Sequence, residues 1–377
     1  MKKLRDVYVI GVGMTPFGRH EDKKLADLGE AAIRDALADA GIDFDVIEQA
    51  ICGHVGQGST AGQRVLGRIG RSGMPITNVE NACASGTTAF RNAWCAIAYG
   101  MNDAALAVGF EKMPRGAIQS NRPDKPADPN KEKRPPMMPL LFSNVFEEHS
   151  RRYGTTREQM AMVSVKNREN AMRNPRAQYK DPLTVDDVMN SRQIAGSLNL
   201  LMCCPTGAGA AAAILCSEEV AKAATSEPIH VVASALQSER DSADSLAAVT
   251  EINQRTANLA YDMAGIKPDD IDMIELHDCF SIAEIIHYEN LGLCDRGEGG
   301  KFIEEGMPKL EGKVAVNPSG GLLSKGHPLG ATGVAQVFEM VTQLRGKAEA
   351  RQVKDAKIGL THCQGFGGAV GVHIFTK

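Results

Sequence analysis

A histidine near the C-terminus lies in a glycine-rich segment whose residue types could perform proton transfer. Residues 319–333 read SGGLLSKGHPLGATG, so five glycines surround His327. Pro328 suits the first residue of a helix, because the N–H that proline lacks would be unpaired there in any case. Apolar residues then continue at helical spacing, at Val334, Val337, Phe338, Val341 and Leu344. A helix start favours negative charge, so His327 is a candidate base or oxyanion donor, the alternative being an incidental histidine in a glycine-rich turn.

Two cysteines stand in segments that could also carry chemistry. Cys83 lies in NVENACASGTTA, residues 78–89, and we expect it at a strand-to-helix turn, where a helix N-terminus lowers the pKa of a thiol. Cys363 lies in IGLTHCQGFGGAVGV, residues 358–372, where glycines let the backbone approach a ligand closely. A single cysteine is more often a small buried apolar residue. With His327, however, the two cysteines fit nucleophilic catalysis by a thiol–imidazole pair.

The chain resembles the thiolase superfamily over essentially its whole length. The matching motifs are NACASG at residues 81–86, GHPLG at 326–330 and CQG at 363–365. Thiolases usually carry Asn-Glu-Ala-Phe where residues 277–280 here read HDCF. With CCPT at residues 203–206, this form is similar to that of the sterol-carrier-protein-2 type thiolases. The resemblance therefore implies an enzyme of the acetyl-CoA acetyltransferase or 3-ketoacyl-CoA thiolase type.

The resemblance also implies roles for individual residues in a Claisen-type exchange at a thioester. Cys83 is the expected nucleophile, activated by His327, and Cys363 is expected to protonate the departing enolate and to deprotonate the CoA thiol. The backbone N–H groups of Cys83 and Gly365 are expected at the acyl oxyanion, and His277 and His327 at the enolate oxygen. His277 stands where thiolases usually have asparagine, and a histidine is bulkier and can titrate. The expected reaction is CoA-dependent cleavage of a 3-oxoacyl-CoA to acetyl-CoA or propionyl-CoA plus a shortened acyl-CoA, or the reverse condensation, through an acyl-Cys83 intermediate.

Alternating apolar segments predict an α/β fold. We expect helices at residues 25–40 and 281–291, and strands at 7–12, 50–54, 104–108, 273–276, 358–361 and 370–375. The resemblance implies two repeated βαβαβαββ halves that form a five-layered αβαβα body with an inserted loop domain. The expected division is an N-terminal half at 1–113 that continues at 202–238, a loop domain at 114–201 and a C-terminal half at 239–377.

The start of the expected loop domain has an unusual composition. Seven of the 17 prolines lie between Pro114 and Pro139, mixed with the basic residues Lys125, Lys131, Lys133 and Arg134. This composition predicts an irregular, basic surface loop. It could be a solvated connection, or it could cover the active site and help to hold the phosphates of CoA. No individual CoA contacts follow from the sequence.

Composition excludes several other classes of protein. A net charge of −4 gives no reason to expect nucleic acid as a partner, and no apolar run approaches the roughly 18 residues of a membrane span. No signal peptide is recognisable, and nine cysteines that include the adjacent Cys203 and Cys204 fit a reducing compartment, so we expect a cytoplasmic protein. Gly11 and Gly13 begin a dinucleotide fingerprint, but Pro16 occupies the next glycine position. CoA is thus expected as a co-substrate with no nicotinamide or flavin, and no metal is expected because no zinc-type ligand spacing occurs.

Three alternatives remain open at this point. Related proteins in the subgroup are retro-aldolases on CoA-linked side chains and lack a cysteine nucleophile, whereas this chain has Cys83, His327 and Cys363 together. Ketosynthases use Cys-His-His or Cys-His-Asn, so a second cysteine favours a thiolase. The chain could also be a subunit that needs a small zinc-ribbon/OB-fold partner protein to act on its acyl-CoA substrate. By resemblance we expect a homodimer or a dimer of dimers.

Overall fold

The computed structural model describes residues 4–116, 136–241 and 244–377. The N-terminal half contributes five neighbouring strands in the order β3-β2-β4-β7-β1. These strands are β1 (Val7–Met14), β2 (Gln49–Gly53), β3 (Ile76–Val79), β4 (Ala104–Lys112) and β7 (Ala208–Ser217). The C-terminal half contributes five more in the order β10-β9-β11-β12-β8. They are β8 (Ile229–Ser238), β9 (Met273–Glu275), β10 (Ala315–Val316), β11 (Ile358–Gly365) and β12 (Ala369–Thr376).

The two halves have the same strand topology. When the strands are counted along the chain within each half, both orders read third, second, fourth, fifth, first. In both halves the second strand pairs in parallel with the third and the fourth, and the fifth pairs antiparallel with the fourth and the first. This identity confirms the duplication predicted from the sequence.

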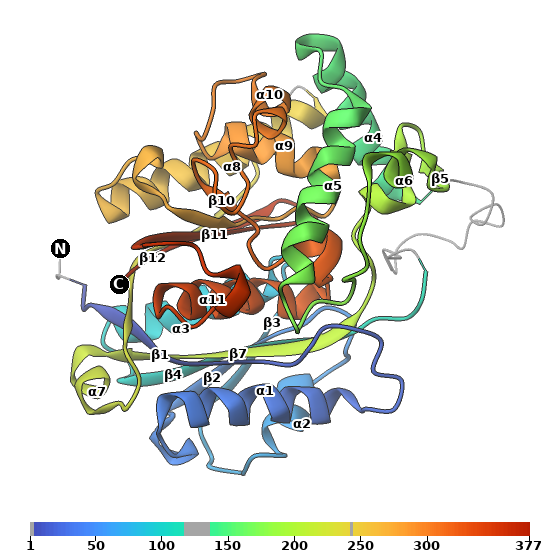
Figure 1. Cartoon of the computed structure of the whole chain (residues 1–377). Helices are drawn as coiled ribbons and strands as arrows, with labels where there is room; N and C mark the ends of the chain where they lie inside the picture. Colours follow the sequence, from blue (N-terminus) through green and yellow to red (C-terminus); the bar gives the residue numbers. More distant parts are fainter. Residues whose placement is uncertain (1–3, 117–135, 242–243) are drawn as a thin grey trace.

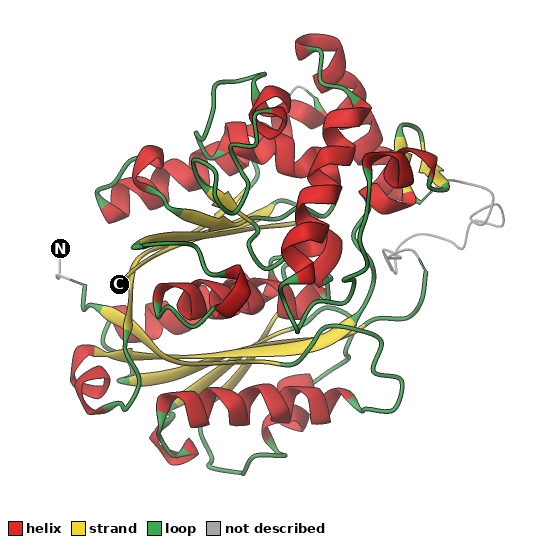
Figure 2. Cartoon of the chain, in the orientation of Figure 1, coloured by secondary structure: helices red, strands yellow, loops and turns green. Residues whose placement is uncertain are grey.

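The two halves stack as five layers (Figure 1). Figure 2 shows the two groups of strands separated by a central layer of helices, which contains α3 (Ser85–Ala98) and α11 (Leu329–Leu344). The outer face of the first group is covered by α1 (Leu25–Ala40) and α2 (Ala61–Leu66). The outer face of the second is covered by α8 (Ser245–Ala264), α9 (Ser281–Asn290) and α10 (Gly299–Glu304). The αβαβα body is therefore confirmed.

The first strands of the two halves connect the groups. Two antiparallel residue pairs between β1 and β8, Tyr8 with His230 and Val9 with Ile229, join all ten strands into one hydrogen-bonded order. Because β8 pairs with β12 and ends at Ser238, the pairing places it in the C-terminal half. This differs from the division expected above, in which the C-terminal half begins at residue 239. The reason is that β8 is the first strand of the second repeat, a role visible only in its partners.

The central helices are apolar on nearly every face because sheets cover them on both sides. Along α11 every residue except Thr342 is buried, which explains a helix with so few polar positions. Glycines let the starts of α3 and α11 meet backbone to backbone. A Cβ on Gly86 would lie 2.6 Å from the carbonyl oxygen of Gly330, and one on Gly330 would lie 2.6 Å from that of Gly53. The helix that follows Cys83 and the helix that follows His327 therefore begin side by side.

The inserted region has defined secondary structure beyond the predicted basic loop. It packs beside the body and contains α4 (Met137–Tyr153), α5 (Arg157–Met172), α6 (Val185–Asn190), β5 (Gln193–Ala195) and β6 (Leu198–Asn199). Most of the basic loop, including its four named basic residues, lies outside the described residues. The remaining elements are short, namely α7 (Glu218–Ala223), single turns at Phe44–Val46, Leu200–Met202, Pro268–Asp270 and Glu349–Arg351, and a π-helical turn, η5 (Gly321–Lys325).

The predicted elements agree with the structure to within a few residues. The helix expected at 25–40 has those bounds, and each of the six predicted strands overlaps an observed one. Pro328 differs by one position, because it is the N-terminal cap of α11 in an extended conformation and the helix begins at Leu329. Across the three ranges that the structure describes, no helix is long and apolar enough to cross a membrane.

Candidate active site

Cys83 lies in a tight turn between β3 and α3, as the sequence predicts. The strand ends at Val79 and the helix begins at Ser85. Ala82 has a positive φ of 49°, which is uncommon for a residue with a side chain, and the N–H of Ser85 donates to its carbonyl oxygen at 3.1 Å. This strained turn leaves Cys83 half-buried just before the first turn of α3.

The surroundings of His327 fix which of its nitrogens carries the proton. Nδ1 lies 2.7 Å from Oγ1 of Thr332, and that hydroxyl donates to the carbonyl oxygen of Pro328 at 3.0 Å. Since the hydroxyl proton is used there, the oxygen accepts from Nδ1–H. Nε2 is then unprotonated, and within the described part of the chain this buried atom has no hydrogen-bond partner. His327 therefore presents a free lone pair to the site, as a base requires.

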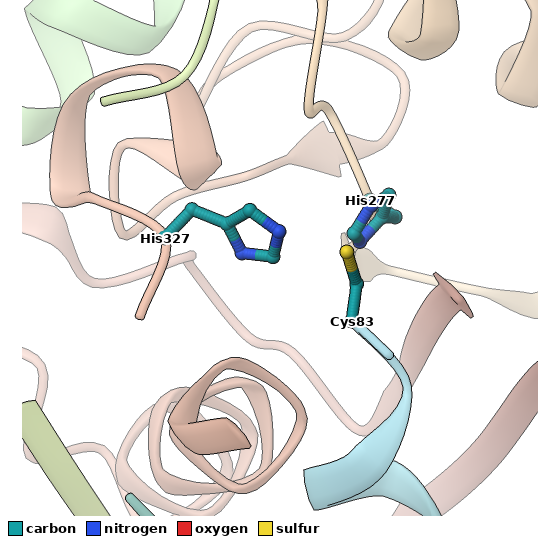
Figure 3. A group of neighbouring side chains, drawn as sticks. All are labelled: Cys83, His277 and His327. Atoms are coloured by element: carbon teal, nitrogen blue, oxygen red, sulfur yellow. The ribbon is translucent and has the colours of Figure 1, made fainter. Parts of the chain in front are cut away.

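His277 and Cys363 come from the C-terminal half and complete the group. His277 follows β9, and its Nδ1 is 3.4 Å from Sγ of Cys363 on β11. The Cys363 thiol can also donate to the carbonyl oxygen of Cys83 at 3.2 Å. One ligand atom from each of Cys83, His277 and His327 lies within 4.8 Å of the others, and Figure 3 shows the His327 ring directed toward the other two side chains. The structure thus brings together residues that are up to 280 positions apart in the chain.

Gly365 lies against the turn that holds Cys83. A Cβ at this position would overlap the carbonyl oxygen of Asn81 and approach Cβ of Ala84 to 3.2 Å. Only glycine allows the end of β11 to pass so close to the nucleophile turn. The end of β11 therefore packs against the residues on either side of Cys83.

Burial keeps the unliganded thiols and imidazoles neutral. It raises the pKa of Cys83 to about 12, although backbone hydrogen bonds, including one from Phe366, act to lower it. It also raises the pKa of Cys363. Burial lowers the pKa of His277 to about 3, and burial, together with the nearby charge of Lys325, lowers the pKa of His327 well below its ordinary value. The lowered pKa predicted for Cys83 is thus wrong for this state, because loss of solvation outweighs the helix start.

Asp278 was not recognised from the sequence, although it stands directly after His277. Its carboxylate accepts from the N–H groups of Leu322 at 2.7 Å and Leu323 at 3.1 Å, both in the turn η5 that leads to His327. One buried carboxylate therefore ties the loop of one histidine to the loop of the other. The position of Asp278 directly after a candidate site histidine is the sequence feature that could have identified it.

Glu111 is a second buried carboxylate that connects the two halves. It accepts from the backbone N–H of Gly330 at 3.0 Å in α11, and from those of Val55 at 2.9 Å and Gly56 at 3.0 Å in the N-terminal half. The start of the helix after His327 is thereby fixed to β4, which carries Glu111. Its motif, VGFEKM at 108–113, resembles the strand after the nucleophile helix in thiolases, but the sequence alone gave no role to the glutamate.

A cavity of about 640 Å³ lies between the inserted region and the body, and its described lining residues include neither of the two site cysteines nor the two site histidines. Apolar residues form much of its wall, and Ser324, which lies three residues before His327 in the chain, also lines it. Three arginines, Arg19, Arg168 and Arg192, also line it, and no acidic side chain occurs among the described residues of its wall. The cavity therefore suits a long ligand that is partly apolar and carries negative charge.

A five-layered body that holds a cysteine and two histidines between its duplicated halves defines a thiolase-fold enzyme. Comparison with known families gives the same result. The family described as "Thiolase, N-terminal domain" matches residues 7–219, and "Thiolase C-terminal domain-like" matches residues 233–377. The chain therefore belongs to the thiolase family, and it is an acyltransferase of that family.

Relatives similar over nearly the whole chain agree with this assignment. "Sterol carrier protein 2" of Bos taurus is 43% identical over 389 residues, which cover 98% of this chain and 72% of that protein. "Acetyl-CoA acetyltransferase" of Methanothermobacter thermautotrophicus is 42% identical over 383 residues, which cover 99% of this chain and all of that protein. The first similarity confirms the sterol-carrier-protein-2 subgroup predicted from the HDCF motif.

Solved structures share the fold at low sequence identity. The "Ltp2-ChsH2(DUF35) aldolase" has a TM-score of 0.86 at 22% identity and covers 99% of this chain and 98% of its own. Human mitochondrial 3-ketoacyl-CoA thiolase in complex with CoA has a TM-score of 0.76 at 19% identity, with coverage of 99% and 98%. These likenesses confirm the thiolase fold.

Proposed function

We propose that the protein catalyses CoA-dependent cleavage of a 3-oxoacyl-CoA, or the reverse condensation, through an acyl group carried on Cys83. The observation that carries the proposal is the free lone pair of His327 Nε2 on a ring directed toward the Cys83 thiol. Because both groups are neutral before substrate binds, His327 takes the thiol proton as sulfur attacks the 3-keto carbon. The bond between C2 and C3 then breaks, leaving the acyl group on Cys83 and an acetyl-CoA or propionyl-CoA enolate.

Cys363 is proposed to move the second proton. Its thiol gives a proton to the enolate carbon, and the resulting thiolate takes one from the incoming CoA thiol. The CoA thiolate then attacks acyl-Cys83, and His327 returns its proton to the Cys83 sulfur. Protons are therefore conserved over the cycle. The sulfur of Cys363 lies 3.4 Å from Nδ1 of His277 and 3.2 Å from the carbonyl oxygen of Cys83, so the thiol is held between these two residues.

His277 is proposed to donate a hydrogen bond to the enolate oxygen. A neutral imidazole has one N–H, so Nε2 can donate only when Nδ1 accepts from the thiol of Cys363. The acyl oxyanion is proposed to lie at the backbone N–H groups of Cys83 and Gly365, and the close approach of Gly365 to Asn81 and Ala84, on either side of Cys83, supports this.

The arginine-lined cavity is proposed to receive CoA and part of the acyl chain. Guanidinium groups bind phosphate oxygens well, and Arg19 is held there by a 3.1 Å bond to Oγ1 of Thr206. Arg19→Gln is expected to raise the KM for CoA with little change in kcat. Arg173→Gln, an exposed change outside the cavity wall, is the matched control.

Thiolysis of acetoacetyl-CoA and of a longer 3-oxoacyl-CoA tests the reaction, with Cys83→Ala beside the unaltered chain. We expect turnover and a mass increase of one acyl group on Cys83, both lost in Cys83→Ala and kept in Cys294→Ala, which changes a half-buried cysteine elsewhere. The absence of both turnover and acyl adduct would instead support the retro-aldolase or the partner-dependent reading. A cytoplasmic location and a homodimer or dimer of dimers remain predictions from the sequence.

A small zinc-ribbon/OB-fold partner is a second proposal. The fold likeness to the "Ltp2-ChsH2(DUF35) aldolase", which includes a DUF35 component, is its support. Turnover by the purified chain alone would argue against an obligatory partner.

A further inference from the structure

Cys83, His277 and His327, each with a role in the proposed acyl transfer, also form a set of possible metal ligands. They come from three separate segments, yet one ligand atom from each lies within 4.8 Å of the others. Ligands of a tetrahedral zinc ion lie about 3.5 Å apart, given metal–ligand distances of about 2.0 to 2.3 Å. Side-chain rotations that move the ligand atoms by about 1 Å would therefore place all three at bonding distance from one ion.

The neighbours of both histidines allow the hydrogen bonds that metal ligands make. A metal-bound imidazole usually donates its other N–H to a neighbouring group, which orients the ring. His327 donates Nδ1–H to Thr332 at 2.7 Å, and its Nε2 is buried with no partner among the described residues. His277 has Nδ1 at 3.4 Å from Sγ of Cys363, so with its proton on Nδ1 it donates to the sulfur and leaves the Nε2 lone pair to bind an ion. This is the opposite tautomer to the one proposed for catalysis, so a bound ion also removes the N–H offered to the enolate oxygen. Both rings are oriented by partners outside the donor set.

The chemistry of the set selects a class of ion. One thiolate and two imidazoles suit a borderline-soft cation such as Zn²⁺, whereas Mg²⁺ and Ca²⁺ prefer oxygen ligands. The set contains no carboxylate. We propose that the unacylated protein binds one Zn²⁺ through Cys83, His277 and His327, with water as the fourth ligand, and that this ion reversibly inhibits the enzyme.

Inhibition follows because zinc replaces the proton on the sulfur of Cys83. The Cys83 thiol loses its proton as the sulfur–zinc bond forms, so one proton is released for each ion bound. The sulfur lone pair that would attack the substrate and the His327 lone pair that would accept the proton are then both held by zinc. An ion and an acyl group thus exclude each other on Cys83. The binding step is independent of the proposed function, whereas the inhibition rests on it.

Spectroscopy with Co²⁺ in place of Zn²⁺ tests the binding directly. Titration of the full chain, freed of metal with chelator, is expected to give one equivalent of bound Co²⁺ with a thiolate-to-cobalt absorption band, displaced by Zn²⁺. Cys83→Ser is expected to lose the band, and Cys294→Ala to keep it. His277→Asn is expected to weaken Co²⁺ binding at least tenfold, because even loss of a group that orients a ligand costs about 10- to 100-fold.

The two proposals fail in distinguishable ways. A wild-type chain with no thiolate-to-cobalt band at millimolar Co²⁺, or a Cys83→Ser chain that binds Co²⁺ as tightly as wild type, overturns the metal site even if thiolysis is active. A band with normal affinity in a chain that turns over no 3-oxoacyl-CoA overturns the proposed reaction and leaves the site. Circular dichroism of each variant separates lost binding from lost folding.

Discussion

Thr332 Oγ1 accepts a hydrogen bond from Nδ1 of His327 at 2.7 Å while it donates its own proton to the carbonyl oxygen of Pro328. A single hydroxyl in the first turn of α11 thereby determines the tautomer of the histidine that faces Cys83. The sequence motif shows the histidine, but the group that sets its chemistry stands five residues later.

Replacement of this hydroxyl tests its role. Thr332→Val keeps the shape of the side chain but leaves Nδ1 without an acceptor, so the imidazole can adopt the wrong tautomer. We expect kcat for thiolysis to fall by about 10- to 100-fold, with KM for CoA nearly unchanged. This loss is smaller than the loss expected on removing a general base altogether. Thr332→Ser should restore most of the activity.

A matched control lies in the same helix. Thr342 makes the same type of bond, from Oγ1 to the carbonyl oxygen of Phe338 at 2.6 Å, but near the other end of α11. Thr342→Val is expected to leave kcat unchanged. An equal loss of kcat in both variants would show that the hydroxyl supports the helix rather than His327.

Gly365→Ala is expected to disrupt the nucleophile turn. The added methyl group would overlap the carbonyl oxygen of Asn81, which is backbone and cannot rotate away. We expect a loss of about 1 to 3 kcal/mol in the free energy of unfolding. We also expect kcat to fall more than it does in Gly359→Ala. Chemical denaturation and thiolysis assays measure the two effects.

Gly359→Ala provides the comparison within the same strand. Its Cβ would meet the side chains of Met340 at 2.7 Å and Met273 at 2.9 Å, which are flexible and can move. This variant is therefore expected to lose some stability but to retain kcat. If Gly365→Ala were as active as Gly359→Ala, the close approach of β11 to the Cys83 turn would not be needed for activity.

The buried ion pair beside the histidine loop is expected to matter for stability. Nζ of Lys325 lies 2.9 Å from Oε2 of Glu275, and both side chains are almost fully buried. Lys325→Met leaves the carboxylate buried without its counter-charge, which should cost about 3 to 5 kcal/mol in the free energy of unfolding.

The exposed pair between Lys313 and Asp269 is the control, because its 3.0 Å distance is nearly the same. Lys313→Met should cost less than about 1 kcal/mol, since water solvates both charges. Urea unfolding of the two variants makes the comparison. Glu275→Gln in the Lys325→Met chain should recover part of the loss, and no recovery would contradict the electrostatic explanation.

The neutral state of Cys83 predicts how its reactivity depends on pH. With a pKa of about 12, the thiolate fraction rises with every pH unit across the neutral and mildly alkaline range. Alkylation by iodoacetamide, with EDTA present, should therefore accelerate about tenfold per unit from pH 7 to pH 10 without a plateau. Mass spectrometry of the peptide that contains Cys83 measures the rate. A plateau below pH 8 would instead indicate a thiolate–imidazolium pair.

Local sequence was sufficient for the elements and for most of the site. The apolar spacing of residues 25–40 predicts α1 with its observed bounds, because a helix is set by contacts three and four residues apart. Glycines and small residues around Cys83, His327 and Gly365 mark close backbone approach, and the motifs they form carry the resemblance to thiolases. The residues that meet in the site were therefore identified before any geometry was known.

Only the tertiary structure decided how these residues behave together. The membership of β8 in the second half depends on its pairing with β12, and the links made by Asp278 and Glu111 join segments tens to hundreds of residues apart. The raised pKa of Cys83 comes from burial between two sheets, which outweighs the local helix start. Sequence patterns encode short-range backbone preference, whereas solvation, tautomer choice and a donor set for a metal ion arise from long-range packing.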